Sequence, residues 1–268
     1  MEMKIFVIKI GGNVIDDEKQ LSSFLNNFAF IHDQKILVHG GGKIATELSK
    51  QLGIEAKMAD GRRITDADTL KVVQMVYGGL INKNIVAQLQ SRNCNAIGLS
   101  GADANIILAA KRALLQEGAE GGSVDFGFVG DVQHVETKNI VSLLNSGFTP
   151  VIAPLTHDGK GQILNTNADT MASAVSVAMA KSFEINLIFC FEKSGVLKNA
   201  DDDNSVIEKM SFSDYEKYKT EKTISKGMIP KLDNAFDAIK QGVKSVVICH
   251  AKDLKKAVSG QKSGTCLN

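Results

Sequence analysis

The sequence contains no tryptophan, and only 6% of its 268 residues are aromatic. Proteins that bind single-stranded nucleic acid stack the bases on aromatic side chains, so this scarcity argues against such a platform. An excess of one charge is also lacking, because 31 basic and 30 acidic residues leave a net charge of +1. A chain this close to neutrality has no bulk field that attracts nucleic acid or an anionic membrane. We therefore expect neither nucleic acid nor membrane as a partner.

Long apolar runs and closely spaced cysteines are lacking too. No window approaches the roughly 18 consecutive apolar residues of a membrane-spanning helix. The first residues run straight into KIFVIKI at 4–10, without the charged, apolar and cleavage regions of a secretory signal. The four cysteines, at 94, 190, 249 and 266, lie outside metal-ligand spacing and are typical of reduced thiols. The sequence thus predicts a cytoplasmic protein.

What the chain does contain is an alternation of strand-like and helix-like segments. This alternation predicts an α/β fold, with a mainly parallel sheet covered by helices on both faces. Short β runs and glycines suggest hairpins added to that sheet, and a change near 181–185 suggests two lobes, 1–182 and 183–268. Strands are expected at 4–10, 35–39, 95–99, 150–154, 186–191 and 245–249, helices at 16–30, 42–52, 66–89, 137–145 and 230–241, and the hairpins at 106–135.

Two of the expected strands end in glycines. The first is followed by Gly11 and Gly12 directly after Lys9 and Ile10, and the second by the run HGGGK at 39–43. Carboxyl ends of neighbouring parallel strands meet at one crevice, where glycine lets the backbone approach an anion. Glycines also turn tight corners between strands and helices, so one such loop is ambiguous. Two loops that each carry a lysine favour an anion site.

Two polar positions at helix starts point to the same chemistry. Lys231 lies next to Pro230, which fits a first helical turn, and a cation there opposes the helix dipole by about 0.3–1 kcal/mol. An unfavourable charge that is nevertheless present at a helix start is a hint of function. Asn167 suits a helix N-cap and Asp169 a first turn, but capping does not explain Asn165. A carboxylate at Asp169 could orient a lysine, bind a metal or accept a proton.

Several function classes remain open at this point. The P-loop pattern GxxxxGK[ST] is absent. Gly40, Gly42 and Ala45 fit a permissive form of the dinucleotide-binding pattern. Asp60 follows at about the spacing at which an acidic residue binds the ribose, although the pattern comes after the second strand rather than the first. A non-catalytic metabolite sensor of the same fold is a further alternative. Lysines at two phosphate-facing positions favour a phosphate-transferring enzyme over a dinucleotide-binding protein or a sensor.

Seven short segments together resemble the amino acid kinase family. They are KIGG, VHGGGK, GRRIT, GLSGAD, GFVGDV, LNTNAD and KGMIPK, and the likeness runs from Lys4 to the terminal SGTCL. Within the family the chain is most similar to enzymes that phosphorylate the side-chain carboxylate of N-acetyl-L-glutamate in arginine biosynthesis. Other members, which phosphorylate carbamate, UMP or aspartate, remain alternatives.

The resemblance implies a three-layer αβα sandwich around a mostly parallel sheet. Its N-terminal lobe, 1–182, would hold the acyl-glutamate and form a homodimer, and its C-terminal lobe, 183–268, would hold ATP. Mg²⁺ would ride on the ATP phosphates, without a metal site of the protein.

The resemblance also implies roles for individual residues. Lys9 would stabilise the transferring phosphoryl group, Lys231 would neutralise the ATP side, and Asp169 would hold both lysines. The other implied residues are Gly11 and Gly12 for phosphate; Gly41, Gly42, Arg63 and Asn165 for the acyl-glutamate; and Glu192, Lys193, Ser194, Gly195, Val196, Leu197, Thr223 and Ser225 for the nucleotide.

The chain departs from the family pattern at a few positions. Glu192 and Lys193 in FEKSGV replace an aspartate and a small or apolar residue, Ala102 replaces a lysine, and Lys226 replaces a glycine. Arg62 in GRRIT replaces an apolar residue. One hypothesis is that Arg62 or the altered SGADA loop admits an acyl group larger or more acidic than acetyl, such as succinyl. The alternative is that Arg62 points to solvent.

Arginine-inhibited members of the family carry an additional N-terminal helix that joins dimers into a hexamer. The present sequence begins at the first predicted strand. From this resemblance we expect the arginine-insensitive, dimeric type, with an activity that millimolar arginine leaves unchanged.

Overall fold

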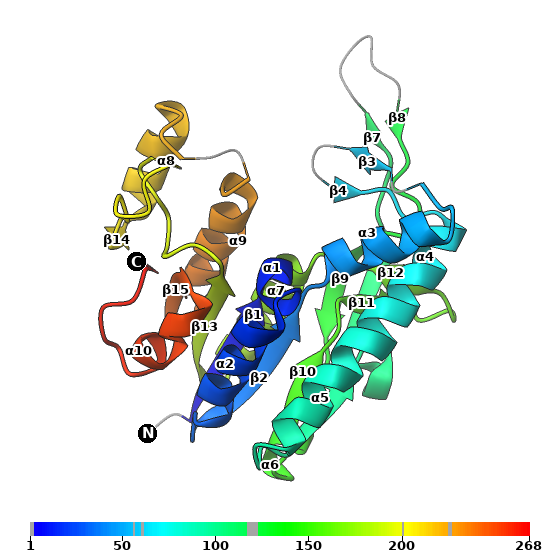
Figure 1. Cartoon of the computed structure of the whole chain (residues 1–268), viewed down its shortest axis with the longest axis horizontal. Coiled ribbons are helices and arrows are strands. Elements are labelled where there is room, and N and C mark those ends of the chain that lie inside the picture. Colours follow the sequence, from blue (N-terminus) through cyan, green and yellow to red (C-terminus); the bar gives the residue numbers. More distant parts are fainter. Residues whose placement is uncertain (1–2, 56, 60–61, 117–122, 200, 225–226) are drawn as a thin grey trace.

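One eight-stranded, mostly parallel sheet runs through the molecule (Figure 1). The computed structural model describes residues 3–55, 57–59, 62–116, 123–199, 201–224 and 227–268. The strand order is β14-β16-β15-β13-β1-β2-β10-β5, in which β16 runs antiparallel to β15. The strands are β1 (Lys4–Ile10), β2 (Gln34–His39), β5 (Ala96–Leu99), β10 (Thr149–Ile152), β13 (Glu184–Phe191), β14 (Lys209–Met210), β15 (Ser245–His250) and β16 (Thr265–Leu267).

The first strand lies at the centre of this sheet and joins its two halves. β1 pairs with β2 on one side and with β13 on the other, both in parallel. Its side chains alternate between two cores, with Ile5 and Val7 in one and Phe6 and Ile8 in the other. A strand covered on both faces needs apolar residues on both, which is why KIFVIKI is nearly continuous in hydrophobicity.

Helices cover both faces, so the predicted three-layer αβα architecture is confirmed. The core around Ile5 and Val7 includes side chains of four α-helices, and the core around Phe6 and Ile8 those of six α-helices. The first set is α6 (Thr137–Asn145), α7 (Ala168–Ala180), α8 (Phe212–Thr220) and α9 (Ile229–Lys240); the second is α1 (Gly12–Ile15), α2 (Glu18–Ala29), α3 (Gly42–Gln51), α4 (Ala67–Val73), α5 (Asn82–Gln90) and α10 (Leu254–Val258).

The segment predicted to carry hairpins on the main sheet instead belongs to a separate four-stranded sheet of order β12-β11-β6-β9. Two of its strands come from far downstream, and such long-range pairing leaves no mark in the local pattern of residues. The strands are β6 (Ile107–Lys111), β9 (Gly130–Val135), β11 (Leu155–His157) and β12 (Ile163–Asn165); two small ribbons pair β3 (Met58–Ala59) with β4 (Arg62–Arg63) and β7 (Leu115–Gln116) with β8 (Ser123–Val124).

The helix predicted over 66–89 is interrupted by a π-helix. The segment η1 (Gln74–Ile81) joins α4 to α5 without a break and contains the pair Gly78 and Gly79. Glycines weaken a regular helix, and π-helical turns occur often at functional sites. Short 3₁₀ turns, η2 (Asp103–Asn105) and η3 (Ala251–Asp253), complete the elements.

No helix within the described ranges has both the length and the hydropathy to cross a membrane. All four cysteines are free thiols, as predicted. Cys190 and Cys249 lie opposite each other on β13 and β15, with their sulfur atoms 3.9 Å apart.

Two glycines near the C-terminus allow a matched test of packing. Gly264 and Gly260 both have left-handed backbones, with φ of 74° and 70°. A Cβ at Gly264 would collide with the carbonyl oxygen of Ile248, whereas a Cβ at Gly260 would meet nothing within 4 Å. We expect Gly260→Ala to lower the free energy of unfolding by about 1–2 kcal/mol, and Gly264→Ala to lower it by at least ~2 kcal/mol more. Urea unfolding measures both, and equal losses would contradict the predicted clash.

Candidate active site

Three charged side chains predicted to act together meet at the centre of the molecule. Lys9 Nζ lies 2.7 Å from Asp169 Oδ1, and Lys231 Nζ lies 2.5 Å from Asp169 Oδ2. Lys9 and Asp169 are buried, while the Lys231 side chain keeps 30% of its exposure. The carboxylate therefore bridges two ammonium groups, one of which remains open to solvent.

Each of the three residues is placed by a different element. Lys9 is the penultimate residue of β1, at the carboxyl end of the sheet. Asp169 lies in the first turn of α7, where the Asn167 side chain accepts hydrogen bonds from the amides of Asp169 and Thr170 at 2.9 and 3.0 Å. Lys231 is the third residue of α9, after Pro230 in its first turn. The capping predicted for Asn167 is confirmed.

The pKa values of the buried pair shift for opposite reasons. Burial lowers the pKa of Lys9 from its ordinary value, and the ion pair with Asp169 opposes that shift. Burial would raise the pKa of Asp169, but the charges of Lys9 and Lys231 and their hydrogen bonds outweigh it and hold this pKa well below the ordinary value. Asp169 is consequently an anion throughout the neutral range and is a poor proton acceptor.

The two glycine loops pack against each other beside this cluster. A Cβ at Gly12 would lie 3.7 and 3.8 Å from the amide nitrogens of Gly41 and Gly42, so a side chain there would fill the space in front of both amides. The amide of Gly11 donates to the carbonyl of Cys190 at 2.9 Å. Gly11 was expected to offer its N–H to a phosphoryl oxygen, and this bond corrects that expectation. The neighbouring Gly12 is the donor that the turn can present.

Arg63 lies over the start of α3, close to Gly42. Its Nη2 donates to the carbonyl of Gly42 at 2.9 Å and to the Thr46 hydroxyl at 2.6 Å. Its Nη1 is buried and makes no hydrogen bond to any described residue. A buried guanidinium nitrogen without a partner is costly, so this atom is suited to receive an anion such as a carboxylate.

Tyr77 is a further residue of this region, and the sequence predicts for it only a place in the helix over 66–89. It lies in η1, and a Cβ at Gly42 would come within 3.9 Å of its hydroxyl oxygen. Burial raises the pKa of Tyr77, while the nearby Arg63 lowers it. In a helical pattern a tyrosine counts as apolar, and only the π-helical segment marks it as different.

Asn165 is joined to the same region through Thr65. Its Nδ2 donates to the Thr65 hydroxyl at 3.0 Å, and its backbone N–H donates to Phe128 at 2.8 Å. Gly127 in the GFVGDV segment allows this packing, because a Cβ there would collide with the carbonyl of Thr65. The structure thus links two residues expected to bind the acceptor, Arg63 and Asn165, through one short segment.

The segment expected to bind the nucleotide forms a tight turn after β13. Glu192 accepts a hydrogen bond from Asn13 at 2.7 Å, and Lys193 pairs with Asp203 at 2.8 Å. Val196 was expected to contact the nucleotide, but its side chain is buried in the core and its carbonyl accepts from the Ile207 amide at 2.8 Å. The turn is fixed by Thr265, whose hydroxyl accepts from the Val196 amide at 2.9 Å; Ser194, Gly195 and Leu197 complete it.

Other predicted positions lie beside or beyond this turn. Thr223 follows α8 and donates its backbone N–H to Tyr218 at 3.0 Å. Ser225 and Lys226 lie outside the described residues, as does Asp60. The backbone of Arg62 is in β4, and its side chain lies outside the described part of the structure. Ala102 precedes η2 in the loop after β5.

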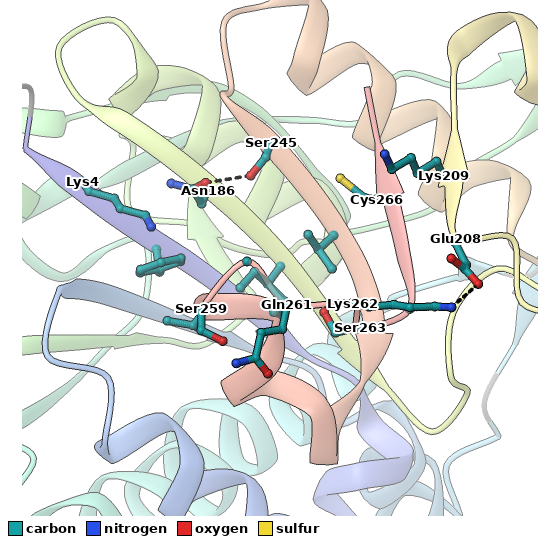
Figure 2. A pocket seen from close by; sticks show the side chains of 17 residues that line it. Lys4, Asn186, Glu208, Lys209, Ser245, Ser259, Gln261, Lys262, Ser263 and Cys266 are labelled. Carbon is teal, nitrogen blue, oxygen red and sulfur yellow. Dashed lines mark hydrogen bonds and ion pairs between the residues drawn. The ribbon is translucent and has the colours of Figure 1, made fainter.

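A cavity of about 570 Å³ lies elsewhere, at the opposite end of the sheet (Figure 2). It is lined by the amino-terminal ends of β1, β13 and β15, at Lys4, Asn186 and Ser245. Lys9 lies at the carboxyl end of β1, so this cavity is separate from the charged cluster. Among the described residues, no group of three or more His, Cys, Asp or Glu side chains is placed to hold a metal ion.

Comparisons with known proteins identify the family of the chain. The model of the amino acid kinase family matches residues 4–250. Acetylglutamate kinases from Cytophaga hutchinsonii and Bacteroides thetaiotaomicron are 57% and 52% identical to the chain, over 97% and 95% of it and 96% of each relative.

Two solved structures have folds similar to that of this chain. The protein smu.665 of Streptococcus mutans is 28% identical, with a TM-score of 0.75 over 91% of this chain and 94% of its own. Carbamate kinase from Giardia, at 13% identity, shares the fold with a TM-score of 0.69 over 99% of this chain and 98% of its own. The chain belongs to the amino acid kinase family.

Proposed function

We propose that the protein transfers the γ-phosphoryl group of ATP to the side-chain carboxylate of N-acetyl-L-glutamate, as a step of arginine biosynthesis. The observation that carries this proposal is the bridge of Asp169 between Lys9 and Lys231. The three charges sum to +1 and lie beside glycine loops that can receive anions. Relatives named acetylglutamate kinase at 50–57% identity over nearly the whole chain support the choice of acceptor.

The reaction needs positioning and charge neutralisation rather than a general base. A carboxylate nucleophile is already ionised at neutral pH, so the enzyme must hold two anions in line and stabilise the charge that builds on the phosphoryl oxygens. We assign Lys9 to the transferring group and Lys231 to the ATP side. Asp169 uses both carboxylate oxygens on the lysines, so we assign it the task of orienting them.

The acceptor would bind at the start of α3. The amides of Gly41 and Gly42 lie at a helix N-terminus, where backbone N–H groups have no intrahelical partner and favour an anion. The buried Nη1 of Arg63 would bind a carboxylate, and Asn165 would contact the amino-acid part. We propose this site for the lobe of residues 1–182.

ATP would bind in the lobe of residues 183–268, along the turn from Glu192 to Leu197. Mg²⁺, when bound, neutralises charge on the phosphates, and phosphate and water oxygens satisfy its preference for oxygen ligands. The carboxylates nearby are already engaged, because Asp169 pairs with the lysines and Glu192 accepts from Asn13. These contacts fit an ion carried by the nucleotide.

We further propose a homodimer that works in the cytoplasm. Met75 and Leu80, both on η1, keep 53% and 51% of their exposure, which suits a surface covered by a second copy. Free thiols and the use of ATP agree with a cytoplasmic location. Sedimentation equilibrium measures the mass, and a monomer at micromolar concentration would exclude the dimer.

The proposed reaction can be observed directly. With ATP, Mg²⁺ and hydroxylamine, N-acetyl-L-glutamate should yield a hydroxamate, which forms only through the acyl phosphate. We expect Lys9→Met and Asp169→Asn each to lower kcat/KM by about 100-fold or more, because the first removes a charge that stabilises the reacting group and the second removes the anion that orients both lysines. A folded wild-type protein that binds both substrates without forming hydroxamate would be a sensor rather than a kinase. Carbamate, UMP and aspartate test the other reactions of the family.

The lowered pKa of Lys9 predicts an alkaline limit of activity. Only the protonated amine stabilises the phosphoryl group, so kcat/KM should fall as pH rises through a pKa below the ordinary lysine value of 10.5. Arginine stays charged at these pH values, and Lys9→Arg should move the limit upward in whatever activity remains. The measurement is the pH profile of ATP consumption. If kcat/KM of Lys9→Arg falls at the same pH as that of the wild type, the group that loses its proton is not Lys9.

The departures at Arg62 and SGADA motivate a second proposal, that the enzyme also accepts an acyl group larger or more acidic than acetyl. An additional cation near the acceptor would favour an acyl group with its own carboxylate, so we expect N-succinyl-L-glutamate to be a substrate with kcat/KM at least equal to that of the acetyl compound. Arg62→Leu should then reduce the succinyl value selectively, by about tenfold. A clear preference for acetyl that Arg62→Leu leaves unchanged would remove the hypothesis.

A further inference from the structure

A buried histidine at the end of β2 has no part in the chemistry described so far. His39 is completely buried, directly before the three glycines of HGGGK. Its Nδ1 lies 2.8 Å from the carbonyl oxygen of Gly40. A carbonyl only accepts hydrogen bonds, so Nδ1 must carry the proton. The sequence alone suggests a structural or surface histidine, and complete burial beside the acceptor loop calls for a more specific role.

The contacts of the other ring nitrogen show that the imidazole of His39 is neutral. Its Nε2 lies 3.2 Å from Nδ2 of Asn82, the first residue of α5, which also donates to the carbonyl of Val151 at 2.9 Å. With the proton on Nδ1, Nε2 is free to accept from the amide group. Burial lowers the pKa of His39 to about 4, in agreement with a neutral ring.

Asn82 is itself held in one orientation. It is buried, and its Oδ1 accepts from Lys83 Nζ at 3.2 Å, which also donates to the carbonyl of Gly98 at 2.9 Å. A Cβ at Gly98 would collide with Asn82 Oδ1, so the glycine at this position of β5 leaves room for the side-chain amide of Asn82. The side-chain amide thereby joins the carboxyl end of β2 to the neighbouring strands β10 and β5.

This network acts on the peptide group that faces the proposed acceptor. The Gly40 amide donates to the carbonyl of Ile10 at 3.1 Å, and the Gly40 carbonyl is held by His39. Because a trans peptide is planar, fixing that carbonyl also fixes the N–H of Gly41 in the opposite direction. Ile81, next to Asn82, packs where a Cβ of Gly41 would be. Ile81 thus packs directly against the loop, and its neighbour Asn82 acts on the loop through His39.

We propose that His39 and Asn82 form a positioning pair that orients the Gly40–Gly41 peptide, and with it the amides of Gly41 and Gly42 that receive the acyl-glutamate. The inference rests on the proposed function. Neither side chain contacts the reacting atoms, so the pair would act through the loop. Loss of the pair should weaken acceptor binding and leave ATP binding unchanged.

The experiment compares three variants with the wild type in the hydroxamate assay, varying N-acetyl-L-glutamate and ATP separately. His39→Leu removes both hydrogen bonds, and His39→Asn keeps an N–H donor near the position of Nδ1. Ser245→Ala is the control, because it removes another side-chain bond between strands, 2.7 Å long to Asn186, at the opposite end of the sheet (Figure 2). Thermal unfolding is measured for all of them.

We expect His39→Leu to raise KM for N-acetyl-L-glutamate about tenfold or more, the effect of losing one hydrogen bond that orients the loop. KM for ATP should stay within about twofold of the wild type, and His39→Asn should recover most of the acceptor affinity. Ser245→Ala should leave both KM values unchanged, whatever it does to the melting temperature. If His39→Leu does not fold, Asn82→Ser should show the same selective rise.

A purely structural role gives a different result. His39→Leu, or Asn82→Ser in its place, would then lower the melting temperature but leave the KM for N-acetyl-L-glutamate unchanged, as in the control, and this would overturn the proposal. Equal loss of affinity in His39→Asn and His39→Leu would overturn it too. An inactive wild type would refute the proposed function itself, whereas an active wild type with insensitive variants would refute only the positioning pair.

Discussion

The arrangement of the molecule depends on one buried carboxylate held between two ammonium groups. Burying a charge is costly unless it is paired and hydrogen-bonded, and Asp169 meets this condition only when Lys9 and Lys231 converge on it. The paired charges tie β1, α7 and α9 together, and the remaining positive charge is available to a phosphoryl group.

The two glycine loops extend this site toward the proposed acceptor position. Gly12 leaves open the space in front of the Gly41 and Gly42 amides, and Arg63 holds the Gly42 carbonyl while presenting a second nitrogen. HGGGK by itself fits a dinucleotide turn equally well. Its position opposite KIGG and next to Arg63 favours an acidic acceptor, and the family assignment agrees with that interpretation.

Much of the local structure is predictable because it depends on neighbouring residues. Apolar alternation places β1 at 4–10, and capping by Asn167 marks the start of α7. Other features depend on partners distant in the chain. The hydrogen bond from Gly11 to Cys190 and the burial of Val196 arise from packing against β13 and Thr265, and both change what these residues can offer a ligand. Tyr77 was overlooked because helical periodicity does not distinguish a core tyrosine from one beside a binding loop.

The sequence by itself determined the α/β class, the parallel sheet, the glycine turns and, through seven motifs in order, the family. Those properties follow from hydrophobic period, turn chemistry and motif spacing, all of which are local. Only the tertiary structure decided that β6, β9, β11 and β12 form their own sheet, and that His39 faces a carbonyl on one side and Asn82 on the other. The physical reason is that hydrogen bonds and ion pairs between distant segments depend on side-chain orientation within the folded core, which no local pattern encodes.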